Sequence, residues 1–308
     1  PTSTNLFFGT AFETSDSVSK NVPTAKKMNV LTPARRPLSF RIATFALAFV
    51  MVSGVQSLVA QSANKEAAEK YNEGLTLLKQ KEYESALNTF EETKTIADAA
   101  GDKGTAAKAE NYVYRLCYNV GVGYIKKGDL DTALGLFEKG IGISPTYYKN
   151  YKGRATVYKE QGNEAAAMEA FIKTAEVASE SGELDERSKA LKQAEGFVAK
   201  SLQAEDFKKV IENGNVYLQF SETANVHYYL AHSYNELGDY QSALSHAEKA
   251  LELDKGSRAS KAKIHFEMGE AYKNIGQYQN AVQSYSEAAY GEFKQRSEHE
   301  MEMISGSN

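Results

Sequence analysis

The sequence predicts an all-α fold, an α-solenoid of about six helix-turn-helix units forming a right-handed superhelix. One spacing of small, aromatic and glycine residues returns six times between Glu66 and Ala288. A repeat period near 34 residues is typical of stacked helical hairpins. After Lys65 helix-forming residues dominate, and the sequence lacks the period-two alternation that indicates strands.

Each position of the repeated spacing has a steric reason. A small residue and a later alanine allow two antiparallel helices to approach closely, and the glycine between them ends the first helix with a left-handed backbone. The aromatic residue that follows the alanine is expected to face the next unit, so stacking is obligatory. The clearest copy contains Gly121, Tyr124, Gly128, Ala133 and Phe137.

These residues resemble the tetratricopeptide repeat family, in an exported bacterial form, over roughly residues 65–289. The fourth unit has Val198 and Val210 where the others have small residues, and we interpret it as degenerate. The connections around residues 95–108 and 179–192 exceed the basic repeat, so the helices are expected to lengthen there. The units are predicted to start near Ala67, Tyr114, Tyr148, Leu191, Ala224 and Ala262.

The segment 28–60 has the layout of a secretory signal peptide. Arg35, Arg36 and Arg41 precede an uncharged run, residues 42–60, after which charged residues resume. The alternative is an N-terminal anchor that leaves residues 42–60 in the inner membrane, because the run approaches the roughly 20 residues that span a bilayer. The predicted location is therefore the periplasm or the cell surface.

The rest of the chain divides around this segment. Residues 1–27 precede Met28 and are expected to be a non-native or disordered leader. Residues 61–289 are predicted to form the solenoid, and residues 290–308 a C-terminal capping helix and tail, because a terminal repeat needs a solvated cap.

Composition and motifs argue against several classes of function. The chain has 36 basic and 40 acidic residues, and without residues 1–60 it is more acidic still, which disfavours nucleic acid as a partner. Cys117 is the single cysteine and can form no intramolecular disulfide. His227 and His265 occupy a first-helix core position, and the histidines lack the spacing of a ligand pair. The sequence contains no phosphate loop or nucleophile elbow, so we predict no enzyme, no cofactor and no metal.

The family resemblance implies a site for a protein or peptide partner. In tetratricopeptide repeats the first helix of each unit lines a concave groove, chiefly through its second, fifth, sixth and ninth positions. Aromatic rings beside Asn, Arg and Lys suit an extended peptide or a partner helix, although such rings can also simply cover neighbouring helices. The implied groove residues are Tyr71, Asn72, Arg115, Tyr118, Asn119, Lys149, Lys152, Tyr228, Tyr229, His232, Lys263 and Phe266.

Charge within this set suggests the chemistry of the partner. Arg115, Lys149, Lys152 and Lys263 form a basic group that would favour an acidic segment. Within the family, cytosolic chaperone adaptors hold an acidic peptide C-terminus in a clamp of polar and basic side chains. This sequence lacks that clamp, because Gly153 stands where the family's clamp has its arginine.

We therefore predict a protein–protein interaction scaffold in the bacterial cell envelope, with a partner of unknown identity in the concave groove. The alternative is a sensor or regulatory module of an envelope signalling system, because the helix–Gly–Asp–Lys–Gly–helix connection at residues 101–104 resembles exported repeat sensors. An enzyme or glycan-binding protein is less expected, since it would need an enclosed pocket.

Overall fold

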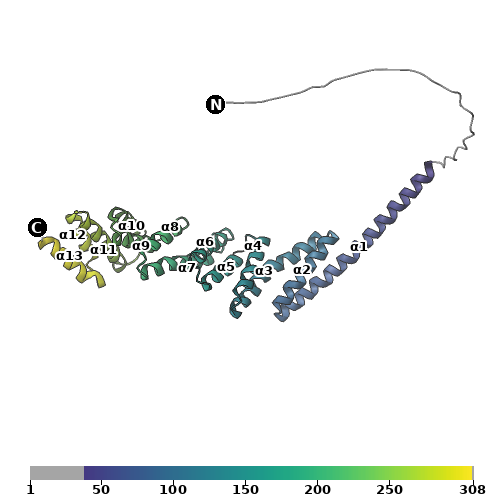
Figure 1. Ribbon diagram of the computed structural model, residues 1–308, viewed down its shortest axis with the longest axis horizontal. Coiled ribbons are helices and arrows are strands. Elements are labelled where there is room, and N and C mark those ends of the chain that lie inside the picture. Colours follow the sequence, from purple (N-terminus) through teal and green to yellow (C-terminus); the bar gives the residue numbers. More distant parts are fainter. Residues whose placement is uncertain (1–37, 307–308) are drawn as a thin grey trace, which may run out of the picture. The chain divides into compact units, whose positions relative to one another are not determined.

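The computed structural model describes residues 38–306, with side chains from residue 58 onward. Over this range the chain forms thirteen α-helices and one short 3₁₀ helix, and no strand (Figure 1). The predicted all-α fold is confirmed. The chain divides into two units, residues 1–55 and 56–308, and the packing described below is that of the second.

Twelve of the helices form six consecutive hairpins. They are α1 (Leu38–Gln80) with α2 (Tyr83–Ala100), α3 (Lys103–Lys127) with α4 (Leu130–Ile143), α5 (Tyr148–Glu160) with α6 (Glu164–Glu180), α7 (Leu184–Gln203) with α8 (Phe207–Leu218), α9 (Ala224–Glu236) with α10 (Tyr240–Leu253), and α11 (Arg258–Asn274) with α12 (Tyr278–Ala288). The 3₁₀ helix η1 (Gly291–Phe293) and α13 (Lys294–Gly306) follow.

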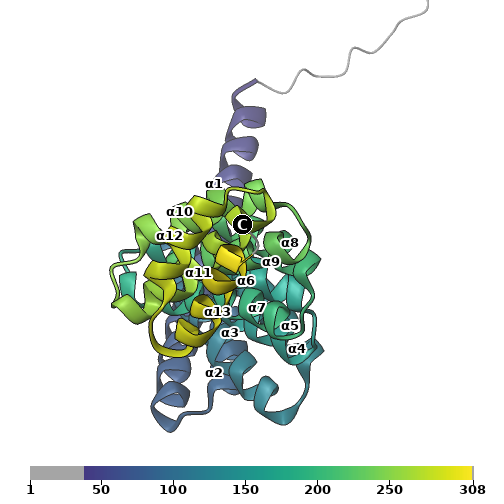
Figure 2. The same ribbon diagram turned by 90° about the vertical axis from the view of Figure 1, so that its left-hand side faces the viewer.

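From α2 onward, each helix packs against the helices before and after it in sequence, which is the arrangement of a solenoid. Figure 2 views the same helices from the C-terminal side. First helices of neighbouring hairpins also meet, α3 with α5, α7 with α9, and α9 with α11. The helices α5 and α7 approach one another less closely than these pairs. The row of first helices is therefore looser between α5 and α7 than elsewhere between α3 and α11.

The second and third hairpins are held together by one aromatic ring placed between two glycines. The ring is that of Phe137 on α4. A Cβ atom added at Gly121 of α3, in the same hairpin as Phe137, would lie 2.6 Å from Cε1 of the ring. The ring also fills the space beside Gly153 of α5, in the next hairpin. The predicted contact of the aromatic residue with the following unit is confirmed, and the same ring covers the glycine of its own unit.

The first hairpin repeats this arrangement. Phe90 of α2 lies against Gly74 of α1, where an added Cβ would lie 2.8 Å from the ring. The same ring stacks on Tyr112 of α3, with centroids 4.5 Å apart. Each ring therefore joins a hairpin internally and to its successor, and the glycines set how closely the helices approach.

The turn between the helices of a hairpin needs a residue with positive φ. Gly128 supplies it after α3 with φ 80°, as predicted. In the first and fourth hairpins Lys81 (φ 65°) and Glu205 (φ 55°) hold this position. A left-handed conformation costs such residues on the order of 1 kcal/mol.

The degenerate fourth unit still folds as a hairpin, because its core uses a different combination of sizes. Val198 and Val210 are both fully buried at the positions of the small residues. Gly214 occupies the aromatic position, and Leu230 of α9 packs on it, 2.8 Å from where a Cβ would lie. The leucine of the next hairpin thus fills the volume that an aromatic ring fills elsewhere.

The predicted lengthening of helices at the two long connections is confirmed. The helix α3 has 25 residues and α7 has 20, whereas α5 has 13. Gly101, with φ 77°, separates α2 from α3, and the carboxylate of Asp102 accepts a hydrogen bond from the amide of Thr105 at 3.0 Å. This side chain caps the first turn of α3.

The leader 1–27 lies outside the described residues, as does the start of the signal-like segment 28–60. From residue 38 its backbone belongs to α1, but side chains are described only from residue 58. In residues 58–306 no helix is long and apolar enough for a membrane span.

The glycine that supports the Phe137 ring provides a direct test of this packing. We expect Gly121→Ala to lower the free energy of unfolding by about 1–3 kcal/mol, because the added methyl group collides with a fully buried ring. Urea unfolding followed by far-UV circular dichroism measures the change.

Gly123 is a matched control in the same helix, since a Cβ there meets no atom within 4 Å. Gly123→Ala should raise the free energy of unfolding by about 0.5–1 kcal/mol, because alanine is the better helix former. Equal stabilities for the two variants would contradict the proposed role of the ring.

Candidate partner-binding surface

The candidate site is the first-helix surface, which we define as one solvent-facing side of α3, α5 and α7. Arg115, Tyr118 and Asn119 share a side of α3, because residues three and four apart lie on one helix face. Lys149 and Lys152 share a side of α5 in the same way. Since α3 packs against α5, the structure brings these five predicted residues into one region.

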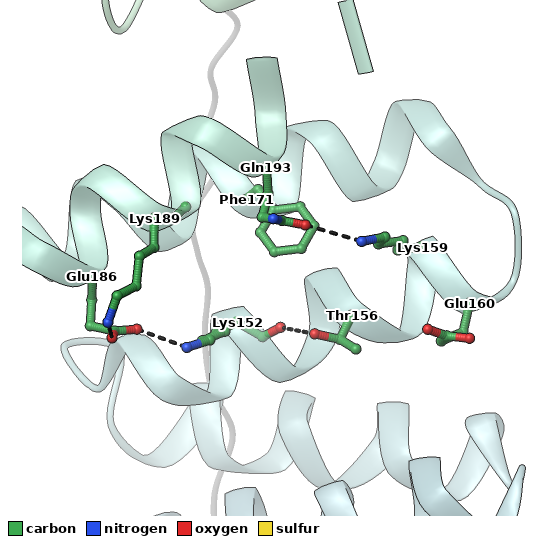
Figure 3. A pocket seen from close by; sticks show the side chains of 9 residues that line it. Lys152, Thr156, Lys159, Glu160, Phe171, Glu186, Lys189 and Gln193 are labelled. Carbon is green, nitrogen blue, oxygen red and sulfur yellow. Dashed lines mark hydrogen bonds and ion pairs between the residues drawn. The ribbon is translucent and has the colours of Figure 1, made fainter. Parts of the chain in front are cut away.

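A pocket of about 340 Å³ lies between α5 and α7, where the first helices are further apart (Figure 3). Phe171, a buried residue of α6, is part of its wall. Polar side chains form most of the remaining lining. They are Lys152, Thr156, Lys159 and Glu160 of α5 and Glu186, Lys189 and Gln193 of α7.

The polar side chains of the pocket bind one another across the gap. Lys152 Nζ of α5 donates to Glu186 Oε2 of α7 at 2.8 Å, and within α7 Lys189 Nζ donates to Glu186 Oε1 at 2.7 Å. Lys159 Nζ donates to Gln193 Oε1 at 3.0 Å (Figure 3). The contacts of Lys152 and Lys159 link α5 to α7 where the helices themselves do not pack closely.

The carboxylate of Glu186 is the electrostatic centre of the pocket. Hydrogen bonds from Lys152 and Lys189 lower the pKa of Glu186 from 4.5 to about 2. The sequence predicts Lys152 as part of a basic group that would favour an acidic segment, but the structure pairs its charge with this carboxylate. Lys159 differs, because its contact is to a neutral amide, and within residues 58–306 its ammonium group forms no ion pair.

Beside the pocket, two cations lie over a pair of tyrosines. The rings of Tyr114 and Tyr147 meet edge to face, with centroids 5.0 Å apart. The guanidinium carbon of Arg115 lies 5.6 Å from the centre of the Tyr114 ring, and Lys149 Nζ lies 6.0 Å from that of Tyr147. In residues 58–306 neither cation forms an ion pair with a carboxylate. Both charges are therefore available to an anionic group.

The tyrosines predicted for the groove near the N-terminal end of the solenoid serve mainly in packing. Tyr71 contacts Phe90 and Tyr112, with ring centroids 5.6 and 6.0 Å away. Tyr118 is half-buried, 6.2 Å from Phe137. Tyr71 therefore covers neighbouring helices, which is the alternative to a role in partner binding. The predicted residues Asn72 and Asn119 are exposed.

The predicted residues of α9 and α11 form a second group, which α7 separates from the first along the chain of helices. Lys263 Nζ lies 4.4 Å from the centre of the Tyr228 ring, and the ring of Tyr229 is 5.8 Å from that of Tyr228. Burial raises the pKa of both phenols above their ordinary value. These aromatic side chains are partly enclosed and offer less free surface than the α3–α5 region.

His232 connects α9 to α11. Its Nδ1 lies 2.9 Å from Oε1 of Glu267, a buried carboxylate that also accepts from Asn235 Nδ2 at 2.8 Å. The hydrogen bond to Glu267 raises the pKa of His232. The predicted groove histidine therefore holds two first helices together.

The prediction that Phe266 lines an open groove is wrong. Its side chain is 3% exposed, with Tyr285 and Phe293 at ring distances of 5.6 and 5.4 Å. The guanidinium of Arg296 covers the ring at 4.4 Å. The reason is that η1 and α13 cover the end of the solenoid, including the groove side of α11.

Sequence comparison of units did not include Glu186, Lys189, Gln193 and Lys159 in the site. The repeat spacing starts the fourth unit near Leu191, so the first turns of α7, which begins at Leu184, lie outside the aligned positions. The spacing of these residues in the sequence could have identified the pairs. Glu186 follows Lys152 by 34 residues and Gln193 follows Lys159 by 34, which is the repeat period.

The geometry offers contacts for binding, and we find no assembled set of catalytic groups on this surface. Within residues 58–306 no cluster of three or more His, Cys, Asp or Glu residues could hold a metal ion. Cys117 is buried, and burial raises the pKa of its thiol to about 11. A thiol with that pKa is protonated at neutral pH and unreactive.

Comparison with known proteins identifies the repeats. Sequence models of the family described as tetratricopeptide repeat match residues 114–147 and 222–289. The first range covers the end of α3 and α4, and the second covers α9 to α12. The predicted resemblance is confirmed.

Named relatives share about a quarter of their residues with this chain over the matched region. The chain is 27% identical over 111 residues to a protein named photosystem I assembly protein Ycf3 from Prochlorococcus marinus (strain NATL1A), which covers 36% of this chain and 58% of the relative. The protein of the same name from Synechococcus sp. (strain CC9311) is 25% identical over 111 residues, with the same coverage. The chain thus spans 58% of the length of these relatives.

Solved structures with similarity include one described as YrrB, a TPR protein with an unusual peptide-binding site. It has 17% sequence identity and a TM-score of 0.33, covering 56% of this chain and 83% of that one. The TPR domain of P58(IPK) has 12% identity and a TM-score of 0.35, covering 78% of each chain.

The lysine bridge across the pocket has a measurable pH dependence. We expect Glu186→Gln to lower the free energy of unfolding at pH 7 by about 0.5–1 kcal/mol, since solvent screens the partly exposed lysines. The folded pKa of Glu186, about 2, lies below its ordinary 4.5. Its contribution to stability is therefore complete above pH 4.5 and is lost as the pH falls toward 2.

Urea titrations at several pH values would measure this difference, with Glu160→Gln as a control that removes a pocket carboxylate with no bridging lysine. The difference between wild type and Glu186→Gln should shrink on acidification, while Glu160→Gln should resemble wild type throughout. A difference that does not depend on pH would argue against the bridge.

Proposed function

Because the chain is a tetratricopeptide repeat protein, we propose that it is a protein-interaction scaffold of the bacterial cell envelope that holds an acidic, extended segment of a partner protein on its first-helix surface. The observation that carries this proposal is the pair of cations over the tyrosines. Arg115 and Lys149 are joined to aromatic rings and to no carboxylate in the described part of the chain.

Charge and shape on this surface suit such a segment. A guanidinium group can bind a carboxylate through two parallel hydrogen bonds, which gives orientation as well as energy. Exposed amides such as Asn119 can pair with the peptide backbone, and tyrosine rings supply contact area at a low entropic cost. The helices are already packed, so little of the surface must become ordered on binding.

The pocket between α5 and α7 gives the segment a place to insert one side chain. Its wall includes the ring of Phe171, and its rim carries Lys159, which forms no ion pair in the described part of the chain. An apolar side chain that reaches toward Phe171 while its backbone stays near Lys159 would fit both features. We propose that the chain acts by holding this segment and not by catalysis.

The signal-like layout of residues 28–60 supports an envelope location. In this proposal the solenoid acts in the periplasm or at the cell surface, either released after cleavage or tethered by residues 42–60. The second candidate function, a sensor or regulatory module of an envelope signalling system, draws on the Gly101–Asp102 turn and the long α3 that follows it. The curated relatives are named for assembly of a protein complex, which accords with a protein as the partner.

Charge reversal tests the partner-binding surface. We expect Arg115→Glu with Lys149→Glu to reduce capture of the natural partner from an envelope extract by at least tenfold, because two attractive contacts become repulsive. Quantitative mass spectrometry of the captured proteins provides the measurement. Circular dichroism should show unchanged helicity.

The control variant reverses the same number of charges elsewhere. Lys208→Glu with Lys255→Glu changes two exposed lysines outside the first-helix surface, one on α8 and one between α10 and α11, and should capture the partner as wild type does. If both variants lose capture equally, net charge and not this surface governs binding. If neither loses it, the site assignment is wrong.

Export is tested separately. The natural gene product, expressed with residues 28–60 intact, should be recovered in the periplasmic or surface fraction, and replacing Arg35, Arg36 and Arg41 together with glutamate should retain it in the cytoplasm. N-terminal sequencing of the exported form distinguishes cleavage from anchoring. Cytoplasmic recovery of the unaltered protein would contradict the envelope location and leave the binding surface unaffected.

A further inference from the structure

Two histidines of the fifth hairpin face each other inside the solenoid. His227 is on α9 and His246 is on α10, and their Nδ1 atoms lie 2.9 Å apart. Two ring nitrogens at this distance share one proton, one nitrogen as donor and the other as acceptor. The contact therefore requires that at least one of the two rings be neutral.

The immediate surroundings of the two rings disfavour a second proton. His227 is 5% exposed, and its Nε2 is buried without a hydrogen-bond partner. Tyr234 of α9 stacks flat on His246, with centroids 5.4 Å apart and planes 8° from parallel. An added charge would thus lie between the two helices, where it is costly unless it is paired.

The charged groups that act on the pair come from the segment before α9 and from α10. Glu222 favours a proton on His227 and Lys249 opposes it. These two residues form an ion pair with each other at 3.5 Å, so their effects on the ring partly cancel. Neither makes a direct hydrogen bond to either histidine in the described structure.

We propose that the His227–His246 pair is an acid-sensitive contact that joins α9 to α10 when at least one ring is neutral and drives the two helices apart when both rings are protonated. In a solenoid each unit is stabilised only by its neighbours. Opening of the fifth hairpin would therefore separate α10 from α9 and would leave the earlier hairpins folded.

The direction of the pH effect follows from the pKa values. Burial lowers the pKa of both rings, and together with the proximity of His227 it brings that of His246 from 6.5 to about 4. Between these values the unfolded chain binds a proton that the folded hairpin does not. The stability supplied by the pair is thus complete above pH 6.5 and falls as the pH decreases toward 4, by up to roughly 300-fold in the ratio of folded to unfolded hairpin.

A neighbouring histidine responds in the opposite direction and helps to locate the effect. The hydrogen bond to Glu267 raises the pKa of His232, so its protonation strengthens the contact of α9 with α11. Mild acid should thus loosen α9 from α10 while α9 stays attached to α11. The site of opening is the interior of the hairpin and not its boundary with the next one.

Hydrogen exchange of the full chain, read by mass spectrometry at pH 7 and pH 5 and corrected for intrinsic rates, tests the proposal. Relative to α5 and α6, the amides of α9 and α10 should lose at least tenfold in protection at pH 5. In His246→Phe, which keeps an aromatic ring beside Tyr234, this acid-dependent loss should disappear. The same loss in wild type and variant would overturn the proposal, as would unchanged protection in wild type.

Two further measurements keep the test decisive if His246→Phe does not fold. His227→Asn should also remove the acid response, whereas His299→Gln, an exposed position on α13, should leave it intact. NMR titration of the wild-type protein should show His227 and His246 with midpoints below 6.5 that shift when the other ring is replaced, whereas the midpoint of His265, whose pKa burial also lowers, should stay unchanged. Titration of both rings at or above 6.5 would overturn the proposal.

Discussion

The close seating of an aromatic ring on glycines of two first helices is the contact on which the rest of the structure depends. Phe137 fills the space beside Gly121 in its own hairpin and beside Gly153 in the next. Because the ring is fully buried, it fixes the distance between α3 and α5 as well as the packing of α4. The first-helix surface exists as one continuous region because this spacing is fixed.

The pocket lies between α5 and α7, where the packing of an aromatic ring against glycines of two first helices is not repeated in the same form. Phe171 holds the aromatic position of the third hairpin, but the lengthened α7 meets α5 mainly through polar side chains. The lysines that span the gap pair with Glu186 and Gln193, so the space stays open between the helices. The lengthened α7 therefore gives rise both to the pocket and to the lysines that surround it.

Much of the fold could be predicted from the sequence, because small residues, turn glycines and aromatics recur with the repeat period. The hairpins, the Gly128 turn and the longer α3 and α7 all followed from this pattern. The residues of the candidate site were harder to predict from the sequence. Phe266 has the same spacing as the half-buried Tyr118, and only the position of α13 shows that Phe266 is fully covered. The pairing of Lys152 with Glu186 depended on where α7 begins, which the degenerate fourth unit concealed.

Position-specific photo-crosslinking in living cells tests the central claim most directly. A photoreactive residue at Asn119 or Thr156, on the first-helix surface, should crosslink to one partner protein, with the attached peptide rich in Asp and Glu. The same residue at Glu169, an exposed position on α6, should give no such product. Crosslinks that form equally at all three positions, or only at Glu169, would contradict the account.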